Sequence, residues 1–154
     1  MDDQHLMREC REERYRASGP GGQRRNKVAT AVRLRHEDSG VVVQAGESRS
    51  LEENRQRAAK RLRERIAIEV RAPFDLKSPA LPEEFAPYRS GDGKLKVNKS
   101  NPHYPIVVAT VLDALAAAEG SYARAAAVLG VTTSQLMRFL QTDQAVWRSL
   151  SETE

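Results

Sequence analysis

Gly21, Gly22 and Gln23 are the residues of this chain whose types and spacing could do chemistry. None of the three offers an acid, a base or a nucleophile near neutral pH. The two glycines lack a Cβ, so the backbone there can approach a ligand closely. The glutamine amide can orient a water molecule but cannot accept its proton as a general base. The tripeptide therefore suits a site that works with a backbone N–H and a positioned water.

The residues around this tripeptide extend the pattern over a longer stretch. It is preceded by Ser18-Gly19-Pro20 and followed by Arg24-Arg25-Asn26-Lys27. Three further pieces follow in order: Ala31-Val32-Arg33-Leu34-Arg35-His36, Ser39-Gly40-Val41-Val42-Val43 and Arg49-Ser50-Leu51-Glu52-Glu53-Asn54-Arg55. In content and spacing, roughly residues 12–70 resemble the catalytic domain of the class I peptide-chain release factors. The chain departs from that family at Pro20, where a small residue is usual, and at Arg24-Arg25, where His-Val is common.

The resemblance implies hydrolysis of the ester between a nascent protein and tRNA, in the peptidyl-transferase centre of the large ribosomal subunit. Gly21, Gly22 and Gln23 would be the catalytic residues. The Gln23 N–H would face the charge that develops in the transition state, and its side chain would position water and exclude larger nucleophiles. The ribosome, its rRNA and peptidyl-tRNA would be the partners and supply the remaining groups, so we expect no cofactor and no metal.

Positive charge is concentrated in the first two thirds of the chain. Residues 1–101 carry 22 Lys+Arg and 16 Asp+Glu, whereas residues 102–154 carry 3 and 5. A basic surface favours a polyanionic partner such as RNA. The residues that we expect to contact RNA or the ribosome share a position in or near the basic segments: Arg16, Ser18, Arg24, Arg25, Asn26, Lys27, Arg49, Arg57, Lys60, Arg61, Lys94, Lys96 and Lys99.

The cysteine content and the hydropathy of the chain indicate the compartment in which the protein works. Cys10 is the only cysteine, which rules out an intrachain disulfide and fits a reducing compartment. Asp2 and Asp3 do not suit a signal-peptide start, and no apolar run approaches the length of a membrane span. We therefore expect a cytoplasmic protein that makes no membrane contact and is monomeric off the ribosome.

Periodicity predicts an α+β fold for residues 1–71: a small mixed or antiparallel sheet, a long packing helix and the GGQ loop. Alternation predicts a half-buried strand at residues 28–35. We also expect a short polar strand at residues 12–17, a turn at residues 36–40 and a further strand at residues 41–43. Ser50 and Glu53 have the spacing of a capping box, which predicts a helix start. The apolar stripe of that helix is expected to comprise Leu51, Ala58, Leu62, Ile66 and Val70.

Residues 72–101 are predicted to form an ordered connector that ends in a basic arm. Five of the seven prolines fall at residues 73–102, which disfavours regular structure. Apolar residues such as Phe74, Phe85 and Tyr88 are too numerous for a free linker, so we expect the connector to lie against the first domain. Lys94, Lys96 and Lys99 form the basic arm.

Residues 102–154 are predicted to form a small all-α module. Ala125 to Leu140 resembles a helix-turn-helix, with Gly130 as a left-handed helix end and Thr132 or Thr133 starting the next helix. The reading helix would present only one cation, Arg138, so specific DNA binding is not expected. Packing or docking and nucleic-acid contact both remain open for this module.

The function that these observations favour is ribosome-dependent release of nascent chains, in termination or in the rescue of stalled ribosomes. The chain length offers no obvious place for a codon-reading domain. Two alternatives from other classes remain: a non-catalytic ribosome- or RNA-binding protein that retains an unused GGQ loop, and a DNA-binding regulator led by the helix-turn-helix.

Overall fold

The computed structural model describes residues 3–16 and 29–152. The chain divides into two compact units, Met1–Ile66 and Ala67–Glu154, here called the sheet unit and the helical unit. Each unit has its own apolar core. An antiparallel sheet with a long helix, followed by several helices, confirms the predicted α+β class.

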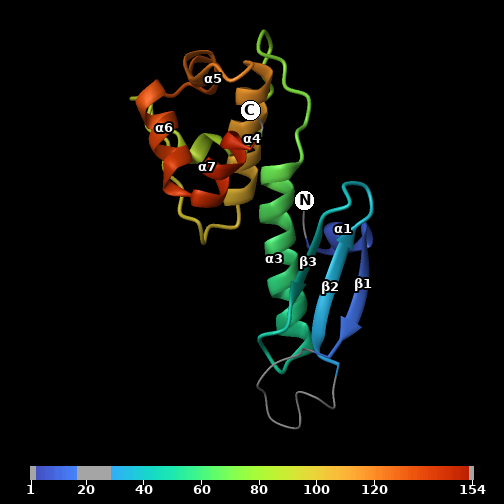
Figure 1. Cartoon of the computed structure of the whole chain (residues 1–154). Coiled ribbons are helices and arrows are strands. Elements are labelled where there is room, and N and C mark those ends of the chain that lie inside the picture. Colours follow the sequence, from blue (N-terminus) through green and yellow to red (C-terminus); the bar gives the residue numbers. More distant parts are fainter. Residues whose placement is uncertain (1–2, 17–28, 153–154) are drawn as a thin grey trace. The chain divides into compact units, whose positions relative to one another are not determined.

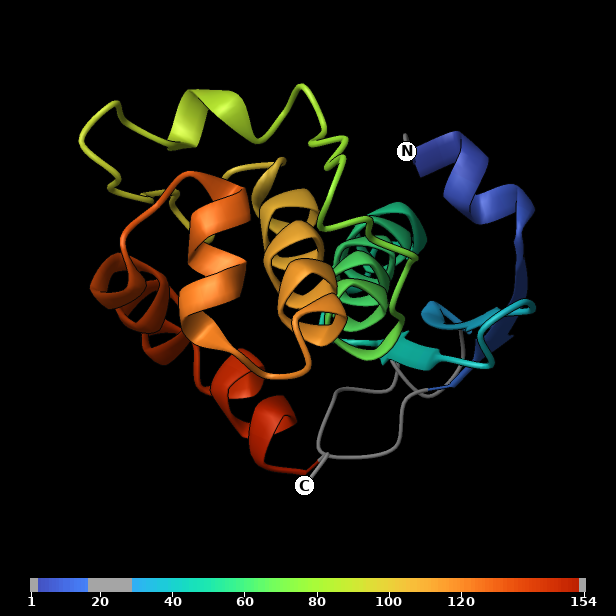
Figure 2. The same cartoon turned by 90° about the horizontal axis from the view of Figure 1, so that it is seen from above.

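The described residues of the sheet unit form three antiparallel strands in the order β1-β2-β3. Its elements are α1 (Asp3–Arg8), β1 (Cys10–Tyr15), β2 (Ala31–His36), β3 (Val42–Ala45) and α3 (Leu51–Glu69), the last of which continues into the helical unit. Tyr15 pairs with Ala31, and Val32 pairs with Ala45. Figures 1 and 2 show α3 running beside the sheet. The turn between β2 and β3 closes at Gly40, whose φ of 75° is the left-handed conformation that glycine tolerates.

The predicted alternation is visible in the burial of β2. Val32 and Leu34 are fully buried, whereas Arg35 is exposed. Leu62 of α3 packs with them in the core of the sheet unit, as the predicted stripe requires. Val70 was wrongly placed in that stripe. The helix ends at Glu69, and Val70 is 39% exposed.

The start of α3 differs from the predicted capping box. Ser50 Oγ accepts from the Glu53 N–H at 3.3 Å, as expected. The return bond does not run from the Ser50 N–H to Glu53. Instead the Ser50 N–H donates to Ser48 Oγ at 3.0 Å, and Ser48 Oγ donates to the Glu53 carboxylate. The Ser48 hydroxyl therefore links the Ser50 N–H to the Glu53 carboxylate at the start of the helix.

In its described residues, the helical unit contains one short 3-10 helix and four α-helices that begin within it. These are η1 (Ala86–Tyr88), α4 (Tyr104–Ala117), α5 (Tyr122–Leu129), α6 (Thr133–Thr142) and α7 (Gln144–Ser151). Figure 2 shows α5, α6 and α7 arranged around α4, in the orange and red part of the chain. Their buried residues form one continuous core. Among the described residues, no helix is both long enough and apolar enough to cross a bilayer.

Local sequence signals set the ends of α5 and α6 as predicted. Gly130 ends α5 with a φ of 73°, in the left-handed region. Of the two threonines considered, Thr132 caps α6, and its Oγ accepts from the Gln135 N–H at 3.2 Å. Asp143 then caps α7, a separate helix that the sequence analysis did not distinguish.

The connector, which we expected to lie against the first domain, packs into the core of the helical unit. Phe85 is fully buried and Leu95 is 6% exposed, and both belong to the core of the helical unit. The Arg89 guanidinium donates to the Leu129 carbonyl at the end of α5, at 2.8 Å. The connector is therefore a structural part of the helical unit.

Candidate functional site

The Gly21-Gly22-Gln23 tripeptide falls in the sequence between the two paired strands β1 and β2. Gly21, Gly22 and Gln23 lie outside the described residues, as do Ser18, Arg24, Arg25, Asn26 and Lys27. Tyr15 at the end of β1 lies opposite Ala31 at the start of β2. The chain therefore leaves the sheet and returns to it at adjacent positions, which together form the stem of the segment.

Asn54 anchors the returning side of this stem. Its side chain is completely buried in the first turn of α3. The amide Nδ2 donates to the Thr30 carbonyl at 2.8 Å and to the Ser48 carbonyl at 2.9 Å. Its Oδ1 accepts from the Ser48 N–H at 3.1 Å. One buried side chain thus joins the stem, the turn after β3 and the start of α3. Asn54 belongs to the stretch that resembles the release-factor helix start, but the sequence alone indicates no role for its side chain.

Replacing Asn54 is expected to damage both stability and release. Asn54→Ala would leave partly buried backbone groups of Thr30 and Ser48 without this partner, at a cost of about 2 kcal/mol. Urea unfolding followed by circular dichroism measures this loss. Gln56→Ala, on the exposed side of the same helix turn, is the matched control. If Asn54→Ala unfolds like Gln56→Ala, the stem does not depend on this amide.

A bidentate ion pair ties the other side of the stem to the helix. Arg55 Nε donates to Glu12 Oε1 at 2.6 Å, and Arg55 Nη2 donates to Glu12 Oε2 at 3.0 Å. These hydrogen bonds lower the pKa of the Glu12 carboxyl, against a smaller opposing effect of burial. Beside it, the Arg33 guanidinium lies 4.8 Å from the centre of the Tyr15 ring. Both strands of the stem are therefore held by side chains.

The Glu12–Arg55 pair predicts a pH dependence of stability. Because the folded-state pKa of Glu12 is lowered, its stabilisation is complete above the ordinary carboxyl range and disappears as the pH falls through the lowered value. Glu12→Gln should therefore cost about 1 kcal/mol at neutral pH, and this difference from the wild type should vanish in acid. Glu13→Gln, at a side chain that is 63% exposed, is the control. A difference that stays constant from neutral to acid pH would contradict this assignment.

The predicted RNA-binding cations of α3 fall into two groups. Arg61 Nη1 donates to the Gln44 carbonyl at 2.7 Å, and Arg61 Nη2 lies 2.6 Å from the Glu47 carboxylate. Arg57 lies 3.7 Å from the same carboxylate. Lys60 is exposed and has no partner within residues 3–16 and 29–152. Lys60 is thus free to meet a phosphate, whereas Arg61 also holds the sheet unit together.

The remaining predicted contacts lie in both units. In the sheet unit, Arg16 follows β1 and Arg49 precedes α3. Both are exposed and have no partner in the described part of the chain. In the helical unit, Lys94, Lys96 and Lys99 are exposed, on either side of buried Leu95. The basic arm is therefore anchored to the helical core.

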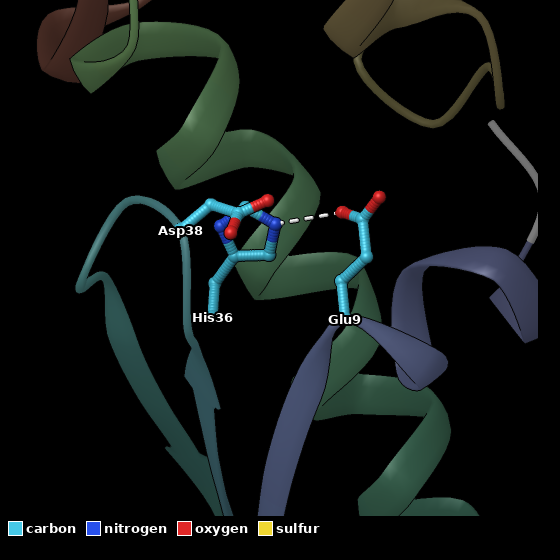
Figure 3. A group of neighbouring side chains, drawn as sticks. All are labelled: Glu9, His36 and Asp38. Carbon is cyan, nitrogen blue, oxygen red and sulfur yellow. Dashed lines mark hydrogen bonds and ion pairs between the residues drawn. The ribbon is translucent and has the colours of Figure 1, made fainter.

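Glu9, His36 and Asp38 form a cluster at the far end of the sheet (Figure 3). Their donor atoms lie within 4.8 Å of one another, the only such group among the described residues. His36 Nε2 is 2.9 Å from Glu9 Oε2, and Nδ1 is 2.7 Å from Ser39 Oγ. The Ser39 N–H also points at Nδ1, at 3.3 Å. This network assigns the tautomer with the proton on Nε2.

Hydrogen bonding therefore uses both ring nitrogens of His36. The bond from His36 is the main cause of the lowered pKa of the Glu9 carboxyl. No ring lone pair is left pointing into open space, as a metal ligand would need. The cluster joins the start of β1 to the β2–β3 turn, which gives His36 a structural role in the sheet unit.

The described residues define a small α+β domain in which an antiparallel sheet is joined to a long helix, and the GGQ sequence falls between its paired strands β1 and β2. The RF-1 domain matches residues 4–80, half of the chain. The chain therefore belongs to the RF-1 domain family. Residues 81–154, which include α4 to α7, lie outside the matched range.

Curated relatives carry release-factor names. The chain is 40% identical over 92 residues to "Peptide chain release factor 1" of Chloroherpeton thalassium, covering 56% of this chain and 24% of that protein. It is 48% identical over 60 residues to "Mitochondrial translation release factor in rescue" of Danio rerio, covering 39% of this chain and 38% of that protein. The matches thus span well under half the length of these relatives.

Proposed function

We propose that this chain hydrolyses the ester of peptidyl-tRNA on the ribosome and so releases nascent chains. The observation that carries the proposal is a GGQ sequence between the paired strands β1 and β2 of a member of the RF-1 domain family. The site of action would be the peptidyl-transferase centre of a cytoplasmic ribosome, with a monomeric protein and no cofactor. The direct test is release of a labelled peptide from purified ribosomes that carry peptidyl-tRNA.

The proposed chemistry depends on the backbone. Water attacks the ester carbonyl, and negative charge develops on the carbonyl oxygen and then on the departing 3′-oxygen of tRNA. The Gln23 N–H donates a hydrogen bond toward that developing charge. Gly21 and Gly22 lack a Cβ, which allows the backbone to approach the tRNA end closely. The Gln23 side chain holds the water but takes no proton. Proton transfer falls to the ribosome and tRNA.

A role in rescue is the more specific form of the proposal. One relative is named for release "in rescue", and its match covers a larger share of that protein than is covered in the first release factor. In this form the helical unit would place the sheet unit on the ribosome. Removing residues 102–154 would then weaken ribosome binding more than the rate of release at saturation.

Free cations of the sheet unit are expected to contribute to ribosome association. Reversing Lys60 and Arg49 to Glu should weaken binding at least about tenfold at low salt and flatten its salt dependence, because two phosphate contacts are lost. Sedimentation with ribosomes at several salt concentrations measures this. Lys77→Glu, at an exposed lysine of the connector, is the control. Equal binding of the double variant and the control would show that these cations are only solvated.

A further inference from the structure

The basic arm runs along α6 from one end of the helix to the other. At the start of the helix, the Thr132 N–H donates to the Gly93 carbonyl at 3.0 Å. A Cβ at Gly93 would stand 2.9 Å from the Thr132 side chain, so the two segments touch there. Past the end of the helix, Lys99 Nζ lies 3.8 Å from Asp143 Oδ1. The arm therefore flanks the helix that a helix-turn-helix protein would use for reading DNA.

A groove of about 450 Å³ lies between the arm and α6. Four cations line it, together with polar and apolar residues from both sides: Lys94, Lys96, Lys99, Arg138, Gln135, Thr142, Leu95, Val97, Tyr104 and Phe139. Its volume falls within the usual range of ligand sites. Its apolar residues are buried or half-buried, and its exposed side chains are the four cations and Thr142.

The positive charge of this groove is poorly neutralised by the protein. Lys94 and Lys99 meet carboxylates only at 3.6 and 3.8 Å, and both lysine side chains are more than half exposed. Exposed ion pairs of this kind contribute little to stability, so another anion can replace the carboxylate. In the described part of the chain, Lys96 and Arg138 have no acidic partner. The groove therefore complements a ligand with regularly spaced negative charge.

We propose that this groove binds a single RNA strand through its sugar–phosphate backbone. The four cations would contact successive phosphates, and the apolar residues of the groove would accept ribose or the edge of a base. Phe139 is only 7% exposed and offers no open face for stacking, so binding should tolerate any sequence. The choice of RNA over other polyanions rests on the proposed function on the ribosome.

The geometry disfavours duplex DNA as the occupant. An α-helix with its side chains is about 10–12 Å across, which already fills a major groove about 12 Å wide. The arm adds a second chain segment alongside α6. Gln135 and Arg138, two of the side chains that a reading helix would use, line the groove beside the arm. Helix α6 therefore cannot enter a major groove unless the basic arm first detaches from it.

The test uses the full chain and a fluorescein-labelled oligouridylate of about 12 nucleotides, longer than the site requires. Fluorescence anisotropy is measured from about 0.05 to 0.3 M salt. Lys96→Gln combined with Arg138→Gln should weaken binding about 25-fold at 0.1 M salt and flatten the logarithmic salt slope by about 1.4, since each phosphate contact on a single strand contributes about 0.7. Arg124→Gln removes an exposed cation of α5 outside the groove and should leave both values unchanged.

Three results would overturn the proposal. The first is an unchanged affinity and slope in the double variant. The second is tighter binding of duplex DNA of the same length, lost with the same two cations. The third is displacement of the RNA by oligoglutamate at a lower concentration than by unlabelled RNA, which would assign the groove to an acidic protein. Release at saturating protein is measured separately, so that a failure of the proposed catalysis leaves the RNA result interpretable.

Discussion

Replacement of Gly22 by alanine is expected to slow peptide release by about two to three orders of magnitude, with ribosome binding intact. Loss of one preorganised donor to a developing oxyanion has an effect of this size. A methyl group at position 22 would stand between the backbone and the tRNA end and would restrict the backbone that presents the Gln23 N–H. Gly21→Ala is expected to act in the same way. Single-turnover release at saturating protein measures the chemical step.

Gln23→Ala provides the contrast, because it keeps the backbone N–H. Release by water should fall less than in the glycine variants, and larger nucleophiles such as hydroxylamine should gain access. Sedimentation with ribosomes confirms that all three variants still bind. Unchanged release by both glycine variants would falsify the catalytic assignment of this segment.

Truncation of Phe85 is expected to cost about 3–5 kcal/mol, the usual loss when a buried phenylalanine becomes alanine. Phe85 is completely buried in the core of the helical unit, although it comes from the proline-rich connector. Its ring also lies 5.9 Å from the Arg89 guanidinium, which bonds the end of α5. Faster hydrogen exchange should therefore appear in α4, α5 and α6, while the amides of β1 to β3 keep their protection.

Phe74→Ala is the matched control for this experiment, because Phe74 contacts the same core but is only partly buried. It should lose clearly less stability than Phe85→Ala. If the exchange increase in Phe85→Ala fell instead on the strands of the sheet unit, the assignment of the connector to the helical core would be wrong.

Features governed by neighbouring residues could be predicted from the sequence. Alternation in residues 28–35 predicts a half-buried strand, which the structure places at Ala31–His36, and Ser121, Gly130 and Thr132 mark helix ends by short-range chemistry. Asp143 carried the same kind of signal for α7 and was overlooked. The GGQ segment could be found because its residue types are unusual in combination.

Features governed by distant contacts could not be predicted in this way. Nothing near Asn54 shows that the Thr30 carbonyl, 24 residues earlier, will be its acceptor. Phe85 is apolar enough for either core, and only the fold selects the helical one. Arg61 and Lys60 look alike in the sequence, yet only Arg61 finds a backbone carbonyl and a carboxylate in the sheet unit. The number of cations on α3 that are free to bind RNA is therefore smaller than the sequence suggests.

Peptide release from stalled ribosomes tests the central claim most directly. Purified ribosomes carrying labelled peptidyl-tRNA and no stop codon are mixed with the wild-type chain, with Gly22→Ala or with buffer. The proposed function requires rapid release by the wild type and release near the buffer rate with the variant. Wild-type release no faster than in buffer, from ribosomes that demonstrably bind the protein, would contradict hydrolysis and leave a ribosome-binding protein with an unused GGQ segment.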